Sequence, residues 1–284
     1  MPNASTTAPT TISTVMPIDP APYAPSAERP VRVKARRLRA DTRVMPHSHA
    51  WAQVAFSTTG VVQLTAADHT YIVPPSRAVW IPPGVEHVVT VVEDAELRTL
   101  YLHQHAPNVG PAGLTTKAAA GRDWQRCRVI EVSALMRELV QQLQADPAAP
   151  ASERERCVAA LLQDELCRAR VVPLGVGLPA DKRLRALCEA VLDDPARHAT
   201  LQSLALEAGA SVRTVSRLFR QQLGTTFAEW RQQVLLAKAL SMAARKRPMS
   251  HIASELGYAS ASAFTAMVRR SVGVPPSRFF AAAR

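Results

Sequence analysis

The first hundred residues alternate between short apolar runs and turn-forming residues, a pattern typical of a β-rich domain. Runs rich in Val, Ile, Thr and Tyr cover residues 31–38, 53–58, 61–66, 69–73, 78–81, 87–92 and 96–103. Strands this short and this closely spaced predict an antiparallel sandwich or barrel, assigned to residues 31–110. Residues 1–30 begin with a stretch rich in Pro, Thr, Ala and Ser, which predicts a disordered arm.

From residue 122 the apolar positions return every three or four residues, which predicts helices. One helical stretch begins near Val129, and a second begins at Ser152. Residues 172–179 are rich in Val, Pro and Gly and are predicted to form a linker. The helical pair, assigned to residues 122–172, is either a dimerisation surface, which would make the protein a homodimer, or a spacer within one chain.

Residues 181–284 contain one short pattern twice. The copies are Ala205-x-x-x-Gly209-x-x-x-x-x-Val215 and Ala253-x-x-x-Gly257-x-x-x-x-x-Ala263. Each places a small residue on one helix, a glycine in the turn and an apolar residue on the next helix, as two closely crossing helices require. Between the copies, residues 227–244 contain neither Pro nor Gly and predict one long helix. The pattern therefore predicts an all-α domain with two helix-turn-helix units.

Charge is spread unevenly along the chain, whose net formal charge is +11. Residues 181–284 hold 16 basic and 7 acidic side chains, whereas residues 41–180 hold 12 and 14. The basic balance therefore accompanies the repeated pattern, which favours double-stranded DNA as a partner. No apolar run reaches membrane-spanning length, no signal peptide is recognisable, and the four cysteines form no CxxC pair. We therefore expect a cytoplasmic protein with reduced thiols and no membrane partner.

The second helix of each repeat is expected to contact DNA. In the first copy the residues predicted to face DNA are Arg213, Thr214, Ser216, Arg217 and Arg220. In the second copy they are Ser262, Thr265, Arg269 and Arg270. Arginines near the start of this helix in the first copy can read bases, whereas the exposed face of the same helix in the second copy is poor in base-reading side chains. We therefore expect the helix of the second copy to bind DNA mainly through phosphate contacts and DNA shape.

The signature of the second copy is Ala253-x-x-x-Gly257-Tyr258-x-Ser260-x-Ser262-x-Phe264, followed by Gly273-Val274-x-Pro276-Ser277-Arg278-Phe279. Together with Arg217-Leu218-Phe219 and Trp230-Arg231 of the first copy, it resembles the DNA-binding domain of AraC/XylS-type transcription regulators. The resemblance covers about residues 181–280 and implies two helix-turn-helix units on a connecting helix. Val268 departs from the family, which usually has an aromatic residue before this arginine. Many members activate transcription, which implies RNA polymerase as a partner if this chain is an activator.

A second constellation lies in the predicted β-rich segment: His47-x-His49-x-x-x-Gln53, followed by Pro82-x-Gly84-x-x-His87. Two histidines on alternate strand positions face the same side, and a third from a neighbouring strand would complete an imidazole cluster. The spacing resembles the two motifs of the cupin barrel and implies His47, His49, Gln53 and His87 as ligand positions, with Gln53 where that family has Glu. Three interpretations stay open: a divalent metal site, a metal-free effector pocket, or residues that only cap the barrel mouth.

Taken together, these patterns predict an α+β multidomain chain with a cupin-like antiparallel β-barrel, a helical linker pair and an all-α C-terminal domain with two helix-turn-helix units. The leading hypothesis is a DNA-binding transcription regulator, without enzymatic activity, controlled by a small-molecule effector or a metal. A cupin dioxygenase or isomerase with a DNA tether is less favoured, because no carboxylate takes the Glu position. An architectural DNA binder without sensing is the third hypothesis.

Overall fold

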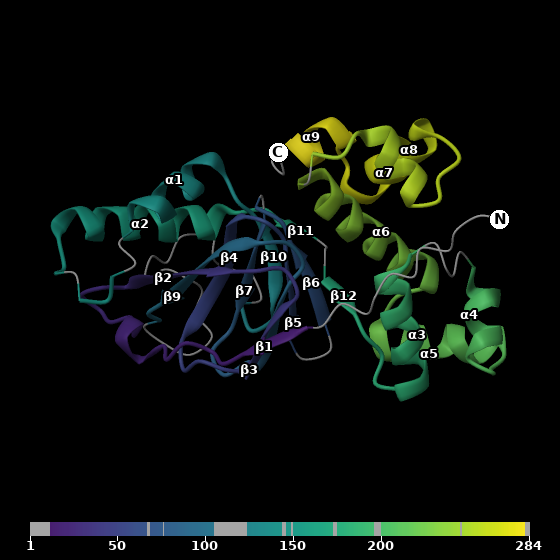
Figure 1. The fold of residues 1–284 in the computed structure, drawn as a ribbon, viewed down its shortest axis with the longest axis horizontal. Coiled ribbons are helices and arrows are strands. Elements are labelled where there is room, and N and C mark those ends of the chain that lie inside the picture. Colours follow the sequence, from purple (N-terminus) through teal and green to yellow (C-terminus); the bar gives the residue numbers. More distant parts are fainter. Residues whose placement is uncertain are drawn as a thin grey trace.

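The computed structural model describes residues 12–66, 69–75, 77–104, 124–143, 146–148, 150–172, 175–195, 200–244 and 246–281. The N-terminal part is β-rich and the C-terminal part is helical (Figure 1). The strands are β1 Ser13–Val15, β2 Val31–Leu38, β3 Thr42–His47, β4 Ala52–Thr59, β5 Val62–Ala66, β6 His69–Val73, β7 Arg77–Ile81, β8 His87–Val91, β9 Ala95–Leu102, β10 Arg128–Glu131, β11 Val171–Val172 and β12 Gly175–Gly177. The helices are the 3-10 turn η1 Ala21–Tyr23, then α1 Ala134–Gln142, α2 Glu153–Arg168, α3 Lys182–Asp193, α4 Leu201–Glu207, α5 Val212–Leu223, α6 Phe227–Ala244, α7 Met249–Glu255, α8 Ala261–Val272 and α9 Pro276–Ala281.

The strands pair into two six-stranded sheets, in the orders β1-β3-β8-β5-β6-β12 and β11-β10-β7-β4-β9-β2. Their inner faces share one core, which includes Leu64 of β5 and Val79 of β7. The sequence predicted an antiparallel barrel, but the pairing among the described strands gives two facing sheets. In addition, β1 runs parallel to β3. The polar pocket described below lies between these two sheets.

The outer face of the second sheet is covered by α1 and α2, which pack against each other on one side of the molecule (Figure 1). The predicted helix at residue 129 is wrong: Arg128–Glu131 is strand β10, paired with β7. Val129 joins the core between the sheets and Ile130 the core under the helices, which is the alternation of a buried strand. Helix α1 begins after Ser133, whose hydroxyl accepts a hydrogen bond from the Met136 amide.

Two segments without a strong sequence pattern are ordered by pairing with the sheets. The predicted disordered arm is wrong for residues 12–30, because β1 pairs with β3 and Arg29 forms two hydrogen bonds to the Glu155 carboxylate on α2. Residues 1–11 lie outside the described residues. The predicted linker contains β12, which pairs with β6. Gly175 lies against Tyr71, where a Cβ would come within 2.7 Å of the ring.

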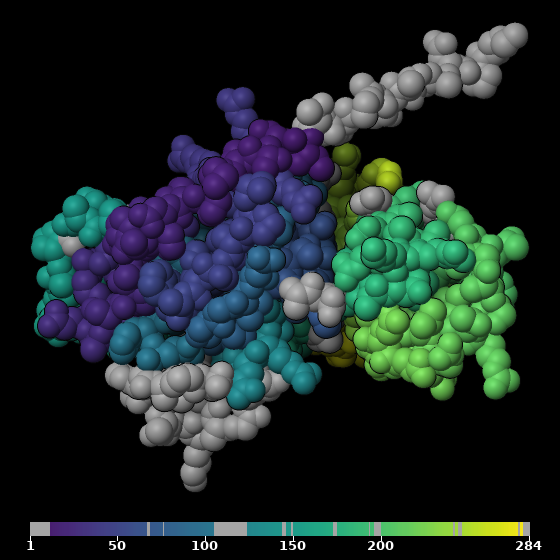
Figure 2. Space-filling model, turned by 90° about the horizontal axis from the view of Figure 1, so that it is seen from below, coloured from purple at the N-terminus to yellow at the C-terminus, as the bar shows by residue number. Residues whose placement is uncertain are grey.

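The helical part consists of two groups joined by α6, with α3–α5 near one end and α7–α9 near the other (Figure 1). Both groups contact the β-rich part, because β12 shares a core with α3–α5 and the helices α7–α9 share the core of the sheets. Figure 2 shows the α3–α5 group beside the strands from below. Trp230 of α6 donates its indole N–H to the Gly177 carbonyl at 2.6 Å. The buried Arg77 of β7 donates to the Phe279 carbonyl of α9 at 3.5 Å. Among the described helices, none is long and apolar enough to cross a bilayer. All four cysteines are free thiols.

Candidate functional site

The helix pairs α4–α5 and α7–α8 are built alike, down to their backbone hydrogen bonds. The first helix of each pair ends at a glycine in the left-handed region, with φ of +59° at Gly209 and +77° at Gly257. The residue after each glycine bonds back to the small residue of the repeat, Ala210 N–H to the Ala205 carbonyl in the first pair, as in a Schellman turn. A side chain other than hydrogen at either glycine would be strained, so the repeated glycines fix the angle between the helices.

The exposed face of α5 is a stripe of three arginines. Arg213, Arg217 and Arg220 are exposed and occupy positions i, i+4 and i+7, which lie on one side of a helix. Val215 and Phe219 are buried on the opposite side. The guanidinium of Arg217 donates to the Gln221 side chain, and no acidic partner is recorded for it among the described residues. Arg213 and Arg217 are therefore available to an anionic partner, whereas Arg220 also interacts with the Glu229 carboxylate.

Two further residues predicted to face DNA are less available. The Thr214 hydroxyl lies 2.9 Å from that of Ser211, the residue that caps α5, and Ser216 is half-buried. The sequence did not single out Val212, which is 40% exposed at the start of α5. A partly exposed apolar residue at the start of this helix could have been read from its position next to the cap.

On α8 the four predicted residues Ser262, Thr265, Arg269 and Arg270 are all exposed. Phe264, Met267 and Val268 are buried beneath them. The two arginines lie in the last turn of the helix and the hydroxyls near its start. This arrangement suits phosphate contacts better than base contacts.

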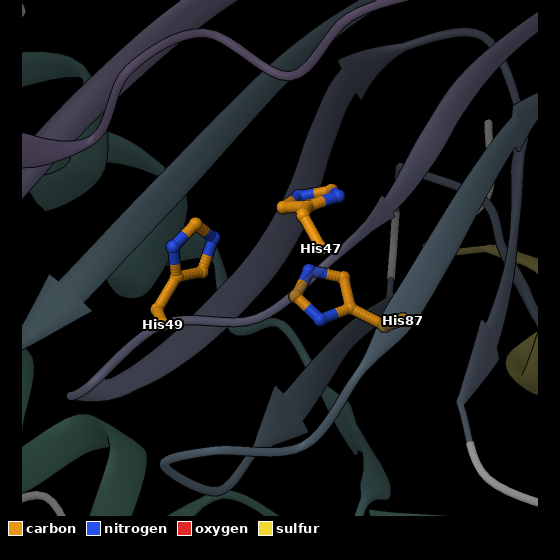
Figure 3. A group of neighbouring side chains, drawn as sticks. All are labelled: His47, His49 and His87. Carbon is orange, nitrogen blue, oxygen red and sulfur yellow. The ribbon is translucent and has the colours of Figure 1, made fainter.

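The second candidate site is a cluster of three imidazoles between the sheets. His47 ends β3, His49 follows in the adjoining loop and His87 begins β8 (Figure 3). The ring centroids of His47 and His87 are 4.3 Å apart, and one ring nitrogen from each of the three histidines lies within 4.8 Å of the others. His47 pairs directly with His87 in the β3–β8 register. The structure thus brings together the three histidines that the sequence predicted to be neighbours.

Backbone carbonyls orient two of these rings. Nδ1 of His47 lies 2.8 Å from the Met45 carbonyl, and Nδ1 of His87 lies 3.0 Å from the Val85 carbonyl. A carbonyl can only accept, so both Nδ1 atoms carry the proton and both Nε2 atoms keep a lone pair. Gln53 completes the set, because its amide nitrogen lies 2.9 Å from Nε2 of His87 and donates to it.

Burial holds the cluster neutral. It lowers the pKa of His49 to about 3 and that of His87 to about 4, and it lowers the pKa of His47 as well. For His87 the bond to the Val85 carbonyl opposes this shift but does not cancel it. At neutral pH the site therefore presents three uncharged imidazoles, which is the protonation state that metal binding requires.

Several buried polar atoms in this region have no protein partner. They are Nδ1 of His49, Oε1 of Gln53, the Tyr101 hydroxyl and the indole nitrogen of Trp51. Because buried polar groups are rarely left unpaired, the unpaired atoms indicate a ligand or ordered water in the site. The cavity has a volume of about 30 Å³, enough for a few water-sized groups.

The sequence missed the basic side of this cavity. Lys34 and Arg36 of β2 line it opposite the histidines. Burial lowers the pKa of Lys34 to about 8. The signal was present in Arg32-x-Lys34-x-Arg36, since alternate positions of a strand face the same side.

The donor set fits a divalent transition metal. Three neutral imidazoles converge, and two of them are oriented by carbonyl acceptors in the manner usual for metal-ligating histidines. Gln53 would have to release His87, and its unpaired Oε1 could then turn toward the ion. The amide supplies no charge, so such a site binds more weakly than one with a carboxylate.

The two helix pairs expose arginine-bearing faces, and they are joined to a β-sandwich with a polar pocket. This combination defines a DNA-binding regulator with a ligand-binding domain. Comparison with known proteins supports this class. Residues 32–168 match the AraC-like ligand binding domain, and residues 204–282 match a helix-turn-helix domain. The chain belongs to the AraC family of transcription regulators.

The chain is similar to individual regulators and to a solved structure over different lengths. The HTH-type transcriptional regulator NimR of Escherichia coli is 29% identical over 236 residues, which cover 83% of this chain and 81% of NimR. RipA of Corynebacterium glutamicum is 34% identical over 102 residues, covering 36% of this chain and 31% of RipA. A crystal structure of ToxT from Vibrio cholerae aligns over 89% of this chain and 98% of its own at 11% identity, with a TM-score of 0.36. The curated relatives are transcription regulators, a family that is not enzymatic, so the chain is a regulator and not a dioxygenase or isomerase.

Proposed function

We propose that this regulator reads a promoter with both helix pairs of a single chain, as two helix-turn-helix units. The observation that carries the proposal is the exposed arginine stripe on α5. Helix α6, with 18 residues, spans about 27 Å at 1.5 Å per residue. Successive major grooves on one side of DNA are about 34 Å apart. A spacer of this length supports the placement of α5 and α8 in neighbouring grooves.

Helices α5 and α8 have different roles in DNA recognition. On α5, Arg213 and Arg217 would contact bases, with Arg220 on a phosphate and Thr214 and Ser216 at the edge of the contact. On α8, Ser262 and Thr265 lie closest to the groove, and Arg269 and Arg270 would contact phosphates. The double-stranded DNA partner also implies action where the chromosome is, in the cytoplasm.

The effector pocket in this proposal is the set His47, His49, Gln53 and His87. Without metal, the unpaired atoms of His49 and Gln53 would hydrogen-bond a small molecule directly. With a divalent metal bound, the ion would supply a Lewis-acidic centre for an oxygen or nitrogen of the effector. In both cases the protein contributes neutral imidazoles, two of them oriented by backbone carbonyls, in a pocket between the two sheets.

A row of paired residues connects this pocket to the DNA-binding helices. Across the first sheet, each residue of the row is opposite the next in register: His47, His87, Ala66, His69 and Gly177. The row ends where the Gly177 carbonyl accepts the indole N–H of Trp230 on α6. An effector that moves β3 against β8 could therefore shift the docking of α6, and with it the balance between two states of the DNA-binding helices.

Self-association would use α1 and α2. Leu135 is 50% exposed and Leu161 is 53% exposed on these helices, which cover the side of the sandwich away from α6 (Figure 1). Exposed leucines on paired helices are suited to a homodimer interface. If the regulator is an activator, RNA polymerase is a further partner.

The test is fluorescence anisotropy on the DNA upstream of the chain's own gene. We expect salt-sensitive, sequence-preferring binding, and Arg213→Ala and Arg217→Ala should each cost about 1–3 kcal/mol on the specific site. Arg37→Ala, which removes an arginine of β2 whose side chain is 90% exposed, is the matched control and should bind as the wild type does. Equal weakening on all sequences would make the α5 arginines phosphate contacts. Binding without any sequence preference would overturn the proposal.

A further inference from the structure

The pocket carries positive charge that no protein group balances. Lys34 is 8% exposed, and the half-buried Arg36 lies two residues along the same strand. Both line the cavity that the histidines close from the other side. Among the described residues that line it, none is Asp or Glu. The ammonium of Lys34 lies 5.3 Å from the centre of the Tyr101 ring, an aromatic face and not an anion.

Acidic side chains near β2 are used elsewhere. Glu96, on the neighbouring strand β9, forms ion pairs with Arg98 at 3.2 Å and with Arg37 at 3.8 Å. The side chain of Arg37 is 90% exposed, so these pairs lie on the outside of the sheet. The outward-facing charges of this edge are therefore compensated, while the inward-facing charge of Lys34 is not.

A buried ammonium without a counter-ion is unfavourable, because burial removes its hydration and supplies nothing in return. In the same cavity the Tyr101 hydroxyl and Nδ1 of His49 are buried and unpaired. An anion placed against Lys34 would accept from the ammonium and the hydroxyl together. Binding of an anion would recover the free-energy cost of the buried, unpaired ammonium, which makes the site selective for charge.

We propose that the effector is a small organic carboxylate, whose acid group binds between Lys34 and Arg36 while the rest of the molecule lies against Tyr101 and the histidine cluster. A cavity of about 30 Å³ suits one carboxylate group better than a bulky polyanion. That this ligand regulates transcription rests on the proposed function, but its binding to the pocket does not require DNA.

The experiment uses the full chain and pairs of small carboxylates with their uncharged amides: formate with formamide, acetate with acetamide, and propionate with propionamide. Binding is measured by calorimetry and thermal shift at constant ionic strength, with and without added Zn²⁺. We expect at least one acid to bind ten-fold or more tightly than its amide. Lys34→Met should abolish this preference, and Lys34→Arg should keep it.

Two controls separate charge recognition from folding. Arg37→Gln removes an exposed charge from the same strand and should leave the preference unchanged. Lys34→Met should raise the melting temperature of the ligand-free protein, because it removes the uncompensated buried charge; if that variant does not fold, Arg36→Gln takes its place and should weaken the preference.

The proposal is overturned if no acid binds better than its amide, or if Lys34→Met keeps the preference. Promoter binding is measured separately on the wild type without any added acid. If the protein binds its promoter specifically but shows no preference for acids, the proposed function stands and only the carboxylate effector is excluded. If the protein binds an acid but does not bind its promoter specifically, the proposed promoter recognition is excluded and the anion site stands.

Discussion

Acid should destabilise this protein through its buried histidines, and His87 allows the effect to be calculated. Its side chain is 2% exposed, and burial lowers its pKa from 6.5 to about 4. The unfolded chain therefore takes up a proton below about pH 6.5, whereas the folded chain resists until about pH 4. The stability that neutral His87 confers is complete above pH 6.5 and is lost as the pH falls. Integrating the two pKa values gives a loss of about 2 kcal/mol between pH 7 and pH 5.

The assay is urea unfolding of chelator-treated protein at several pH values from 7.5 to 5. In His87→Gln the free energy of unfolding should fall less steeply than in the wild type, by about 2 kcal/mol over this range. Parallel slopes for the wild type and His87→Gln would show that His87 is not held neutral by burial and would refute the reasoning.

Three further changes test the fold and its coupling. Gly60→Ala should destabilise by about 1–3 kcal/mol, since φ is +70° there and a Cβ would lie 2.2 Å from the Asp94 carbonyl oxygen; unchanged urea unfolding would contradict this. Arg77→Met should cost about 3 kcal/mol and make the helical part more sensitive to proteolysis, because it removes a buried ion that bonds to α9; equal digestion rates would argue against a docked helix. Trp230→Phe leaves the Gly177 carbonyl without its donor and should lower the free energy of unfolding by about 1–3 kcal/mol. It should also weaken the response of promoter binding to an effector. An unaltered response would show that the paired residues leading to β12 do not connect the pocket to α6.

The elements with strong periodicity could be predicted from the sequence. The strand over residues 31–38 and that over residues 69–73 have the predicted bounds, because apolar and β-branched residues are concentrated there and turn residues enclose them. Ser152 caps α2 where the sequence predicted the start of a helix, since a serine hydroxyl before an apolar-periodic run satisfies a free backbone N–H. Ser211 caps α5 in the same way. The histidine cluster was predicted from the alternation of His47 and His49 and from the resemblance to the two cupin motifs, which supplied His87.

The remaining elements depend on partners that lie far away in the sequence. Strand β3 carries His47 but has few apolar residues, and it is held by β1 and β8 on either side. Ser13–Val15 is a strand only because β3 offers it a free edge. Lysine is usually a surface residue, and Lys34 is buried only because the other sheet faces it. Local patterns carry no information about such contacts.

We propose that the histidine pocket controls transcription through the helix pairs that bind the promoter. The most direct measurement is promoter occupancy and transcription in cells that carry the wild type, His49→Gln or Arg217→Ala, followed through changes of growth condition. We predict that Arg217→Ala leaves its promoters, whereas His49→Gln stays bound and holds transcription at one fixed level. Transcription that responds in His49→Gln as it does in the wild type would contradict the account.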